Sequence, residues 1–424
     1  MRINLLHQHF LKSSGICTDT RTISENCLFF ALKGDNFNGN EFAKKALESG
    51  AYKVIIDENE FEREGTILVD NVLKTLQQLA TFHREYLAIP IIALTGSNGK
   101  TTTKELINAV LSTKYSTTAT KENLNNHIGV PLTLLSMDSE TKIGIVEMGA
   151  NHLKEIELLS NITKSDYGYI TNFGKAHLEG FGSLEGVVKA KTELYRYLKE
   201  NNKTVFVNAT DDKQLQKSEG INRITFGGEN QDCFIELIDA SNQVIVSYKN
   251  QEIKSNLIGL YNFNNIAAAI CMGDFFKVSE KNIKNAIESY IPTNNRSQLI
   301  KKGSNQIILD AYNANPSSML AALENFNQTE GNAKILFLGD MFELGSEAET
   351  EHQNIVDFIE NSSFNKTFLI GENFFKTEVS SENILKFNTF EGLQKELETN
   401  TFTQSQILIK ASRGMALERI LDII

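Results

Sequence analysis

Short apolar runs alternate with longer segments of helical periodicity through most of this chain. From residue 89 onward, runs such as IIALTG and KIGIVEMG alternate with segments such as KTTTKELINAVLS and LEGVVKAKTELYRYLKE. In the first of these segments Leu106, Ile107, Val110 and Leu111 recur three and four residues apart, the spacing of one helical face. Continuous apolar runs are typical of strands that are covered on both faces, so the pattern predicts an α/β fold with a mainly parallel sheet and helices on both sides.

The pattern changes in character on either side of this central stretch. Before residue 88, CLFFALKG and YKVIID flank a helical EFAKKALESG, which predicts a smaller α/β unit. Between Cys233 and Gly259, the alternating runs FIELI and QVIVSY predict an antiparallel edge. The strand-like runs near the C-terminus are QIILDAYN, AKILFLGD, KTFLIGE and SQILIKASRG. Asp310, Asp340 and Lys410 follow or end such runs, at the sheet edge where open α/β folds bind ligands.

Two of the four prolines, Pro90 and Pro292, mark predicted domain boundaries, because the residue before a proline is disfavoured in a helix. Three domains also agree with a length of 424 residues at about 150 residues per domain. The predicted domains are 1–88, a small α/β domain; 89–294, a central parallel-sheet domain; and 295–424, a C-terminal Rossmann-like α/β domain.

Composition and charge narrow the classes of function. Hydrophobic residues make up 41% and charged residues 22% of the chain, which provides a sizeable core. The net charge of −11 argues against nucleic acid or an anionic membrane as the main partner, so any phosphate must be bound by a local site. No run approaches the ~18 apolar residues of a membrane span, and His7, His9 and Lys12 interrupt any signal-peptide core. The four cysteines are far apart, so we expect neither a disulfide framework nor a zinc site, and a cytoplasmic location.

The strongest local signal is TGSNGKTT at residues 95–102, between a predicted buried strand and a predicted helix. This is the context of a P-loop, in which glycines let backbone N–H groups approach phosphate, the lysine reaches the β- and γ-phosphates and the next hydroxyl holds Mg²⁺. The predicted nucleotide-binding residues are Gly96, Ser97, Asn98, Gly99, Lys100, Thr101 and Thr102, with Lys100 also catalytic. The general pattern has glycine where Leu94 stands, and the alternative is a plain glycine turn.

Eight motifs in a fixed order extend this signal across the chain: TGSNGKTTTKE, NLNNHIGVPLTLL, EMGANHLKEI, NFGKAHLEGFGSLEGVVKAKTELY, GLYNFNNIAAAI, DAYNANPSSM, LGDMFELG and KASRG. Together with DTRTISENCLFFALKGDNFNGNEFAKKALESGA near the N-terminus, they closely resemble the Mur ligases, the amide-forming ATPases of bacterial cell-wall precursor synthesis. The shortened P-loop is this family's own form. The resemblance implies that the first domain binds a UDP-sugar, the second binds ATP and the third completes the ligase site.

The resemblance also implies a reaction. ATP phosphorylates a peptide carboxylate, an amine attacks the acyl phosphate, and the intermediate collapses to an amide and phosphate. AHLEGFGS, AYNANPSSM and GDMFELG are most similar to the family members that join D-alanyl-D-alanine to UDP-N-acetylmuramoyl-tripeptide, so these substrates, ATP, Mg²⁺ and a monomeric enzyme are expected. Two alternatives stay open: a related Mur or folylpolyglutamate-type ligase with another amine substrate, and a P-loop switch ATPase, which has no use for a second metal.

The resemblance further assigns metal positions. Thr101 matches the P-loop metal ligand, while Glu147 and His177 match residues at a second Mg²⁺. Lys191 matches a lysine that CO₂ carbamylates, which turns a cation into an anionic oxygen ligand, whereas Lys189 lies on another helical face and is expected to be solvated. The alternatives are a solvated strand-end carboxylate for Glu147, a structural or surface histidine for His177 and an ordinary surface lysine for Lys191.

Ligand contacts complete the expectations. The resemblance implies nucleotide contacts from Asn262 and Asn265 to adenine, from Arg296 to phosphates and from Asp310 to ribose, although the family has His at Tyr261 and Gly at Asn295. Expected substrate contacts are Asp19, Thr20 and Arg21 at the UDP-sugar, Asn123, Asn125 and Asn126 near the acyl phosphate, and Lys410, Ser412 and Arg413 at a carboxylate. The alternatives are a helix cap for the two adenine-side asparagines, an exposed turn for DTRT and a plain turn for Ser412.

Overall fold

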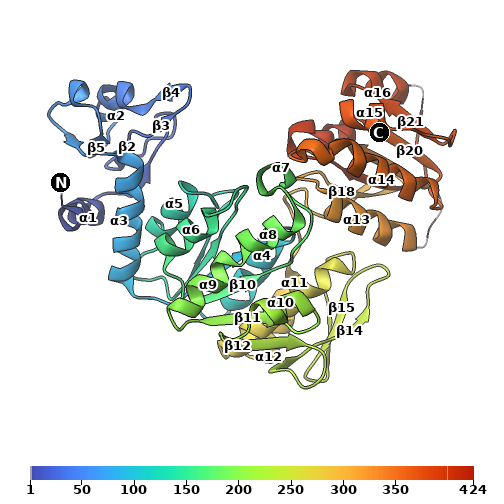
Figure 1. Ribbon diagram of the computed structural model, residues 1–424, viewed down its shortest axis with the longest axis horizontal. Coiled ribbons are helices and arrows are strands. Elements are labelled where there is room, and N and C mark those ends of the chain that lie inside the picture. The colour runs from blue at the N-terminus through green and yellow to red at the C-terminus, as the bar shows by residue number, and fades with distance from the viewer. Residues whose placement is uncertain (1, 330, 332, 399) are drawn as a thin grey trace.

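The computed structural model, which describes residues 2–329, 331, 333–398 and 400–424, folds into three α/β lobes that follow one another along the chain (Figure 1). The central lobe lies between the other two, and α3 (Val72–Leu87) runs from the first lobe into it. The predicted three-domain α/β architecture is therefore confirmed.

The first lobe has a parallel sheet in the order β1-β2-β5-β6 and a short hairpin beside it. Its elements are α1 (Ile3–Lys12), β1 (Ile16–Cys17), β2 (Leu28–Phe30), β3 (Lys33–Gly34), β4 (Phe37–Asn38), α2 (Ala43–Glu48), β5 (Lys53–Ile56) and β6 (Thr66–Leu68). Helix α3 packs against α1 and β2 of this lobe and against α5 and α6 of the next, so it joins the two. The predicted boundary at residues 88 and 89 comes directly after this helix.

The central lobe is built on a parallel sheet in the order β13-β12-β11-β10-β7-β9-β8. Its strands are β7 (Ile91–Thr95), β8 (Thr117–Ala119), β9 (Ile143–Glu147), β10 (Tyr167–Ile170), β11 (Thr204–Asn208), β12 (Asn222–Gly227) and β13 (Cys233–Phe234). Its helices are α4 (Lys100–Leu111), α5 (Gly129–Leu135), α6 (Glu155–Thr163), α7 (Leu178–Phe181), α8 (Leu184–Lys191), α9 (Glu193–Glu200), α10 (Asp212–Lys217), α11 (Tyr261–Phe275) and α12 (Glu280–Ser289). Ile91 and Ala93 pack in one core with α5, α6, α8 and α9, while Ile92 and Leu94 pack in another with α4, α11 and α12. Both faces of the sheet are covered, as predicted.

The segment after Cys233 differs from its prediction. β13 pairs in parallel with β12, and the antiparallel strands β14 (Glu236–Asp239), β15 (Ile245–Tyr248) and β16 (Gln251–Lys254) form a sheet of their own. Their alternation reflects one buried face, where Val246, Tyr248 and Ile253 join the core that contains α12. An alternating pattern predicts antiparallel pairing, but it does not specify which sheet the strands join.

The C-terminal lobe has a sheet in the order β17-β18-β22-β19-β20-β21, in which β17 runs antiparallel to the rest. Its elements are β17 (Gln298–Lys302), β18 (Asn305–Asp310), α13 (Pro316–Gln328), β19 (Lys334–Gly339), α14 (Ala348–Glu360), β20 (Lys366–Ile370), α15 (Glu372–Lys376), β21 (Ile384–Phe387), α16 (Phe390–Leu397) and β22 (Gln406–Lys410). The carboxyl ends of β18, β22 and β19 lie side by side, so the strand-end residues predicted from the sequence share one edge. Within the part of the chain that the structure describes, no helix combines the length and apolar character needed to cross a bilayer.

Candidate active site

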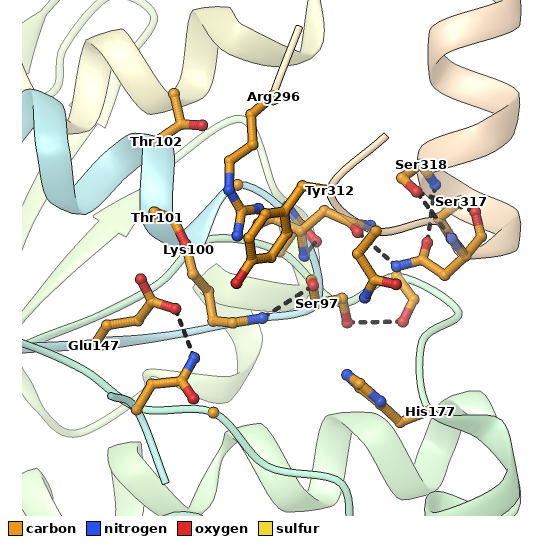
Figure 2. Close-up of a pocket in the computed structure, with 18 of the residues that line it drawn as sticks. Ser97, Lys100, Thr101, Thr102, Glu147, His177, Arg296, Tyr312, Ser317 and Ser318 are labelled. Atoms are coloured by element: carbon orange, nitrogen blue, oxygen red, sulfur yellow. Dashed lines mark hydrogen bonds between the residues drawn. The ribbon is translucent and has the colours of Figure 1, made fainter. Parts of the chain in front are cut away.

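A cavity of about 820 Å³ lies between the central and C-terminal lobes, and residues of both line it (Figure 2). Most of the predicted site residues contribute to its lining. They are Ser97, Asn98, Gly99, Lys100, Thr101, Thr102, Asn123, Asn125, Asn126, Glu147, His177, Asn262, Asn265, Arg296, Asp310 and Lys410. The parallel strands of each lobe end at this cavity, which brings together residues that are more than 300 positions apart.

The P-loop joins the end of β7 to the start of α4, and its backbone needs both of its glycines. Gly96 has φ +145°, and a Cβ there would lie 1.9 Å from Thr171 Oγ1. Gly99 has φ +76°, and a Cβ there would lie 2.6 Å from Asn265 Oδ1. Both positions therefore combine a left-handed backbone with a close approach that only glycine allows. The loop leads into the N-terminus of α4, where backbone N–H groups favour an anion.

The Lys100 side chain folds back over the P-loop. Its Nζ donates to the carbonyl oxygens of Gly96 at 2.8 Å and Ser97 at 3.1 Å (Figure 2). Burial lowers the pKa of Lys100 below its ordinary value. The negative charge of Glu147 opposes this shift, and the positive charge of Arg296 adds to it. A phosphate oxygen is a stronger acceptor than these neutral carbonyls, so the ammonium group is placed to exchange them for phosphate.

Glu147 ends β9 and is only 2% exposed, so the interpretation as a solvated carboxylate is wrong. Its Oε1 accepts from Asn125 Nδ2 at 2.8 Å, while its buried Oε2 has no hydrogen-bond partner among the described residues. A buried carboxylate oxygen without a partner is costly, and a hard cation such as Mg²⁺ would satisfy it. In the described parts of the chain no three His, Cys, Asp or Glu side chains form a ready-made metal group, so hydroxyl, carbamate or phosphate oxygens would have to complete the ligand set.

Lys191 is a buried lysine behind the cavity wall rather than a surface residue. It is 1% exposed, its Nζ donates to the Ala150 carbonyl at 3.2 Å, and this nitrogen lies 5.1 Å from the centre of the Phe181 ring. Burial, and next the charge of Lys100, hold the pKa of Lys191 well below its ordinary value. A neutral amine is the form that reacts with CO₂. Lys189 is exposed, as predicted, because α8 turns it to another face.

His177 connects the two lobes. It lies at the N-terminal end of α7 with φ +52°, and its ring points into the cavity (Figure 2). Its Nδ1 is hydrogen-bonded to Glu343 Oε2 of the C-terminal lobe. Glu343 was not among the residues predicted from the sequence, since its LGDMFELG motif carried no chemical assignment.

The two adenine-side asparagines are not helix caps. Helix α11 begins at Tyr261, so both lie inside it, and both are buried. Asn265 Nδ2 donates to Asn262 Oδ1 at 2.8 Å, and Thr103 Oγ1 donates to Asn265 Oδ1 at 2.9 Å. This chain of hydrogen bonds ties α11 to α4 beside the P-loop. Tyr261, where the family has His, shares a hydrogen bond with the Ser297 hydroxyl at 2.8 Å.

Arg296 stacks on an aromatic ring that the sequence reasoning missed. Its guanidinium carbon lies 3.7 Å from the centre of the Tyr312 ring, and its buried Nε has no hydrogen-bond partner within the described residues. The residue before it, Asn295, has φ +55°, a left-handed conformation that asparagine tolerates and glycine adopts freely. The left-handed backbone at this position therefore suits asparagine as well as the family's usual glycine. An aromatic residue two positions after a strand end was the available signal for Tyr312.

The expected basic cluster at the end of β22 does not form as one group. Lys410 is 2% exposed and pairs with Asp310, its register partner on β18, at 2.5 Å. Ser412 is buried, where its Oγ accepts from the Phe342 backbone N–H at 2.9 Å, and Arg413 is exposed. Both of these residues lie outside the lining that the described residues form. Asp310 and Lys410 thus neutralise each other at the cavity wall.

The three DTR residues lie in the first lobe, away from this cavity. Arg21 and Asp19 form an exposed ion pair at 2.6 Å, and the hydrogen bonds from Arg21 lower the pKa of Asp19 to about 2. Thr20 lies between them and is half-buried. The pairing holds Arg21 at the surface of the first lobe, with donors of its guanidinium group still facing solvent.

Three family models match the chain: the Mur ligase family catalytic domain over residues 12–84, the Mur ligase middle domain over 94–273 and the Mur ligase glutamate ligase domain over 295–419. The chain is 36% identical to the UDP-N-acetylmuramoyl-tripeptide–D-alanyl-D-alanine ligase of Bacillus subtilis over 422 residues, which is 96% of this chain and 92% of the relative. Among solved structures it is similar to MurF of Acinetobacter baumannii, with 29% identity, a TM-score of 0.88 and coverage of 99% and 97% of the two chains. It is also similar to the MurF ligase of Thermotoga maritima in complex with ADP, with 26% identity, a TM-score of 0.84 and coverage of 98% and 97%.

Proposed function

The chain belongs to the Mur ligase family, and we propose that it is the ATP-dependent ligase that joins D-alanyl-D-alanine to UDP-N-acetylmuramoyl-tripeptide. The observation that carries this proposal is the cavity between two lobes, in which a P-loop and the half-unpartnered carboxylate of Glu147 face each other. A site that transfers a phosphoryl group to a carboxylate needs both a phosphate cradle and a means to neutralise charge. The full-length similarity to ligases of this specificity supports the choice of substrates.

The chemistry follows from charge. A peptide carboxylate attacks the γ-phosphorus of ATP, the bond from that phosphorus to the β–γ bridging oxygen breaks, and ADP leaves. The amine of D-alanyl-D-alanine then attacks the acyl carbon, loses a proton and expels inorganic phosphate, which leaves an amide. The first step brings two negative groups together, and the second develops negative charge on the tetrahedral intermediate beside the phosphate. Lys100 and Arg296 supply positive charge that stabilises both.

One Mg²⁺ would bind to the Thr101 hydroxyl, and a second would bind to Glu147 Oε2, His177 and a carbamylated Lys191. The ions supply charge neutralisation for the phosphate oxygens. Two features support this fit: the unpartnered Glu147 oxygen and the buried Lys191 amine, whose pKa is lowered by its surroundings. The carbamate would turn this neutral amine into an anion near Lys100, whose positive charge would stabilise it.

The remaining contacts are assigned from position. On this proposal the phosphates are held by Ser97, Asn98, Gly99 and Thr102. The adenine is contacted by Asn262 and Asn265, and the ribose by Asp310. The acyl-phosphate end of the cavity is lined by Asn123, Asn125 and Asn126. Tyr312 supports Arg296 by stacking. On the same proposal the exposed Arg413 attracts a substrate carboxylate, while Lys410 balances the charge of Asp310 and Ser412 accepts from the Phe342 backbone N–H.

Each of the three domains is proposed to have its own role. We assign 1–88 to the UDP-sugar, with Asp19, Thr20 and Arg21 at its surface, 89–294 to ATP and 295–424 to completion of the ligase site. The enzyme is proposed to act as a monomer, because its cavity is lined by two lobes of one chain. We propose a cytoplasmic location, because both proposed substrates, ATP and a UDP-linked precursor, are cytoplasmic molecules.

Product analysis tests the proposal. The protein is incubated with ATP, Mg²⁺, D-alanyl-D-alanine and UDP-N-acetylmuramoyl-tripeptide that ends in either lysine or diaminopimelate, and the product is weighed by mass spectrometry. The proposal expects a mass increase of one dipeptide less one water for at least one tripeptide. Addition of a single amino acid, or of glutamate to a folate, would instead identify a related ligase with another amine substrate.

A further inference from the structure

Glu343 and His177 meet across the gap between the C-terminal and central lobes. Both residues have left-handed backbones, with φ +61° and φ +52°, a conformation that is unfavourable for residues with a side chain. The Glu343 carboxylate binds His177 Nδ1, and the Glu343 backbone carbonyl accepts from the Glu179 N–H at 3.1 Å. Two strained residues that contact each other across the gap indicate a junction whose geometry is imposed by both lobes.

The loop that carries Glu343 is anchored firmly in the C-terminal lobe. Asp340 at its base accepts from the Asn373 and Phe374 backbone N–H groups, both at 2.9 Å. The next residue, Met341, donates its backbone N–H to His352 Nε2 at 3.0 Å. The tip of the loop therefore moves with the C-terminal lobe, and its contact with His177 exists only when that lobe is docked.

A carboxylate accepts hydrogen bonds and cannot donate them when ionised, so the hydrogen in this contact belongs to His177 Nδ1. In the neutral imidazole the other nitrogen, Nε2, then carries the lone pair. The ring points into the cavity (Figure 2), so this lone pair is the part of His177 that is available to a bound cation. Without the carboxylate, neither the tautomer nor the ring orientation is fixed by any contact that the described residues make through Nδ1.

We propose that Glu343 is a positioning residue: by binding His177 Nδ1 it fixes the tautomer and the orientation of the ring, so that His177 is ready for the metal site only when the C-terminal lobe has docked. This inference rests on the proposed function for the role of His177, but the geometry of the contact does not depend on it. It links docking of the two lobes to assembly of the site, since the residue that positions the histidine belongs to the C-terminal lobe.

The test reads the tautomer directly. Protein labelled with ¹⁵N-histidine is measured by NMR at a pH where the imidazole is neutral, and the His177 signals are assigned by their loss in His177→Asn. The wild type is expected to show hydrogen on Nδ1. Glu343→Ala should shift His177 toward the form with hydrogen on Nε2, which free imidazole side chains prefer, and should lower kcat about 10–100-fold with little change in the KM for ATP.

Two further variants separate positioning from general damage to the interface. Glu343→Gln keeps an oxygen acceptor and should restore the Nδ1 signal and most of kcat. Glu351→Gln weakens the Lys175–Glu351 ion pair, which spans the same lobes at 2.6 Å without contacting His177, and should leave the tautomer unchanged. Hydrogen on Nε2 in the wild type, or an unchanged tautomer and kcat in Glu343→Ala, would overturn the proposal. A correct tautomer in a protein that does not ligate would refute the proposed function instead.

Discussion

Asn315 Nδ2 donates a hydrogen bond to Asn98 Oδ1 at 2.7 Å, so the first residue before helix α13 of the C-terminal lobe holds a side chain of the P-loop in the central lobe. The same Asn315 uses its Oδ1 to accept from the Ser318 backbone N–H at 2.9 Å, which caps α13. The side-chain amide of Asn315 therefore makes hydrogen bonds to both lobes. The phosphate loop is tied to the position of the C-terminal lobe before any ligand contact is made.

The two roles of Asn315 can be separated by substitution. Asn315→Asp keeps the helix cap but loses the donor, so the thermal stability should stay near wild type while the KM for ATP rises, by about fivefold for one lost hydrogen bond. Asn315→Ala should lose the cap as well and cost about 1 kcal/mol in the free energy of unfolding. Steady-state kinetics and thermal melts measure the two effects. An Asp variant with unchanged ATP kinetics would show that this bridge does not influence the P-loop.

Lys191→Ala should nearly abolish ligation while ATP affinity stays largely intact, because the P-loop holds the nucleotide independently of a carbamate. Acetate or formate, which can occupy the vacated space as an anionic oxygen ligand, should partly restore the rate. Since Lys191 is buried, Lys191→Met provides a variant of similar apolar volume whose melting temperature reports any packing loss. The matched control is Lys189→Ala on the exposed face of α8, which should behave like wild type. Full activity in Lys191→Ala, or a sensitive Lys189, would refute the carbamate assignment.

A buried histidine pair should make the stability depend on pH. His83 Nε2 contacts the Met137 carbonyl at 2.8 Å and must donate, so His83 Nδ1 accepts from His7 Nε2 at 3.0 Å in the neutral pair. Burial lowers the pKa of both histidines; His83 lowers that of His7 further, while the Met137 carbonyl and Asp138 raise that of His83. As the pH falls below about 6.5, the unfolded chain therefore binds more protons at these two histidines than the folded state does. The folded state loses stability between that pH and the lowered pKa values of His7 and His83.

The measurement compares melting temperatures of wild type and His83→Gln between about pH 7.5 and 5.5, the range in which histidines titrate. Glutamine can donate to the Met137 carbonyl and accept from His7, so it keeps both hydrogen bonds and removes one titrating group. The wild type should lose more stability on acidification than the variant. Parallel curves would show that the pair does not control acid sensitivity.

Local pattern predicted the parts of the fold that depend on neighbouring residues. The apolar run before Gly96 and the helical spacing after Lys100 both reflect short-range geometry, so the strand, loop and helix of the P-loop were found correctly. The antiparallel strands after Cys233 were found but assigned to the wrong sheet, because pairing partners are set by tertiary packing.

Contacts between segments that are distant along the chain could not be predicted from the sequence. Asp310 and Lys410 were each assigned to a ligand, yet the register of β18 and β22 pairs them with one another. The burial of Glu147 and Lys191 likewise arises from helices and loops that are folded over them. Asn295 shows the reverse case, in which a departure from the family pattern is explained once its left-handed backbone is known.

The central claim is that phosphoryl transfer serves one specific ligation, and ADP release tests it most directly. ADP formation is followed with ATP and Mg²⁺ while UDP-N-acetylmuramoyl-tripeptide and D-alanyl-D-alanine are omitted one at a time. The account predicts rapid ADP formation only when both peptide substrates and Mg²⁺ are present, with one ADP for each amide formed. Rapid turnover of ATP without either peptide, or with a single amino acid in place of the dipeptide, would contradict it.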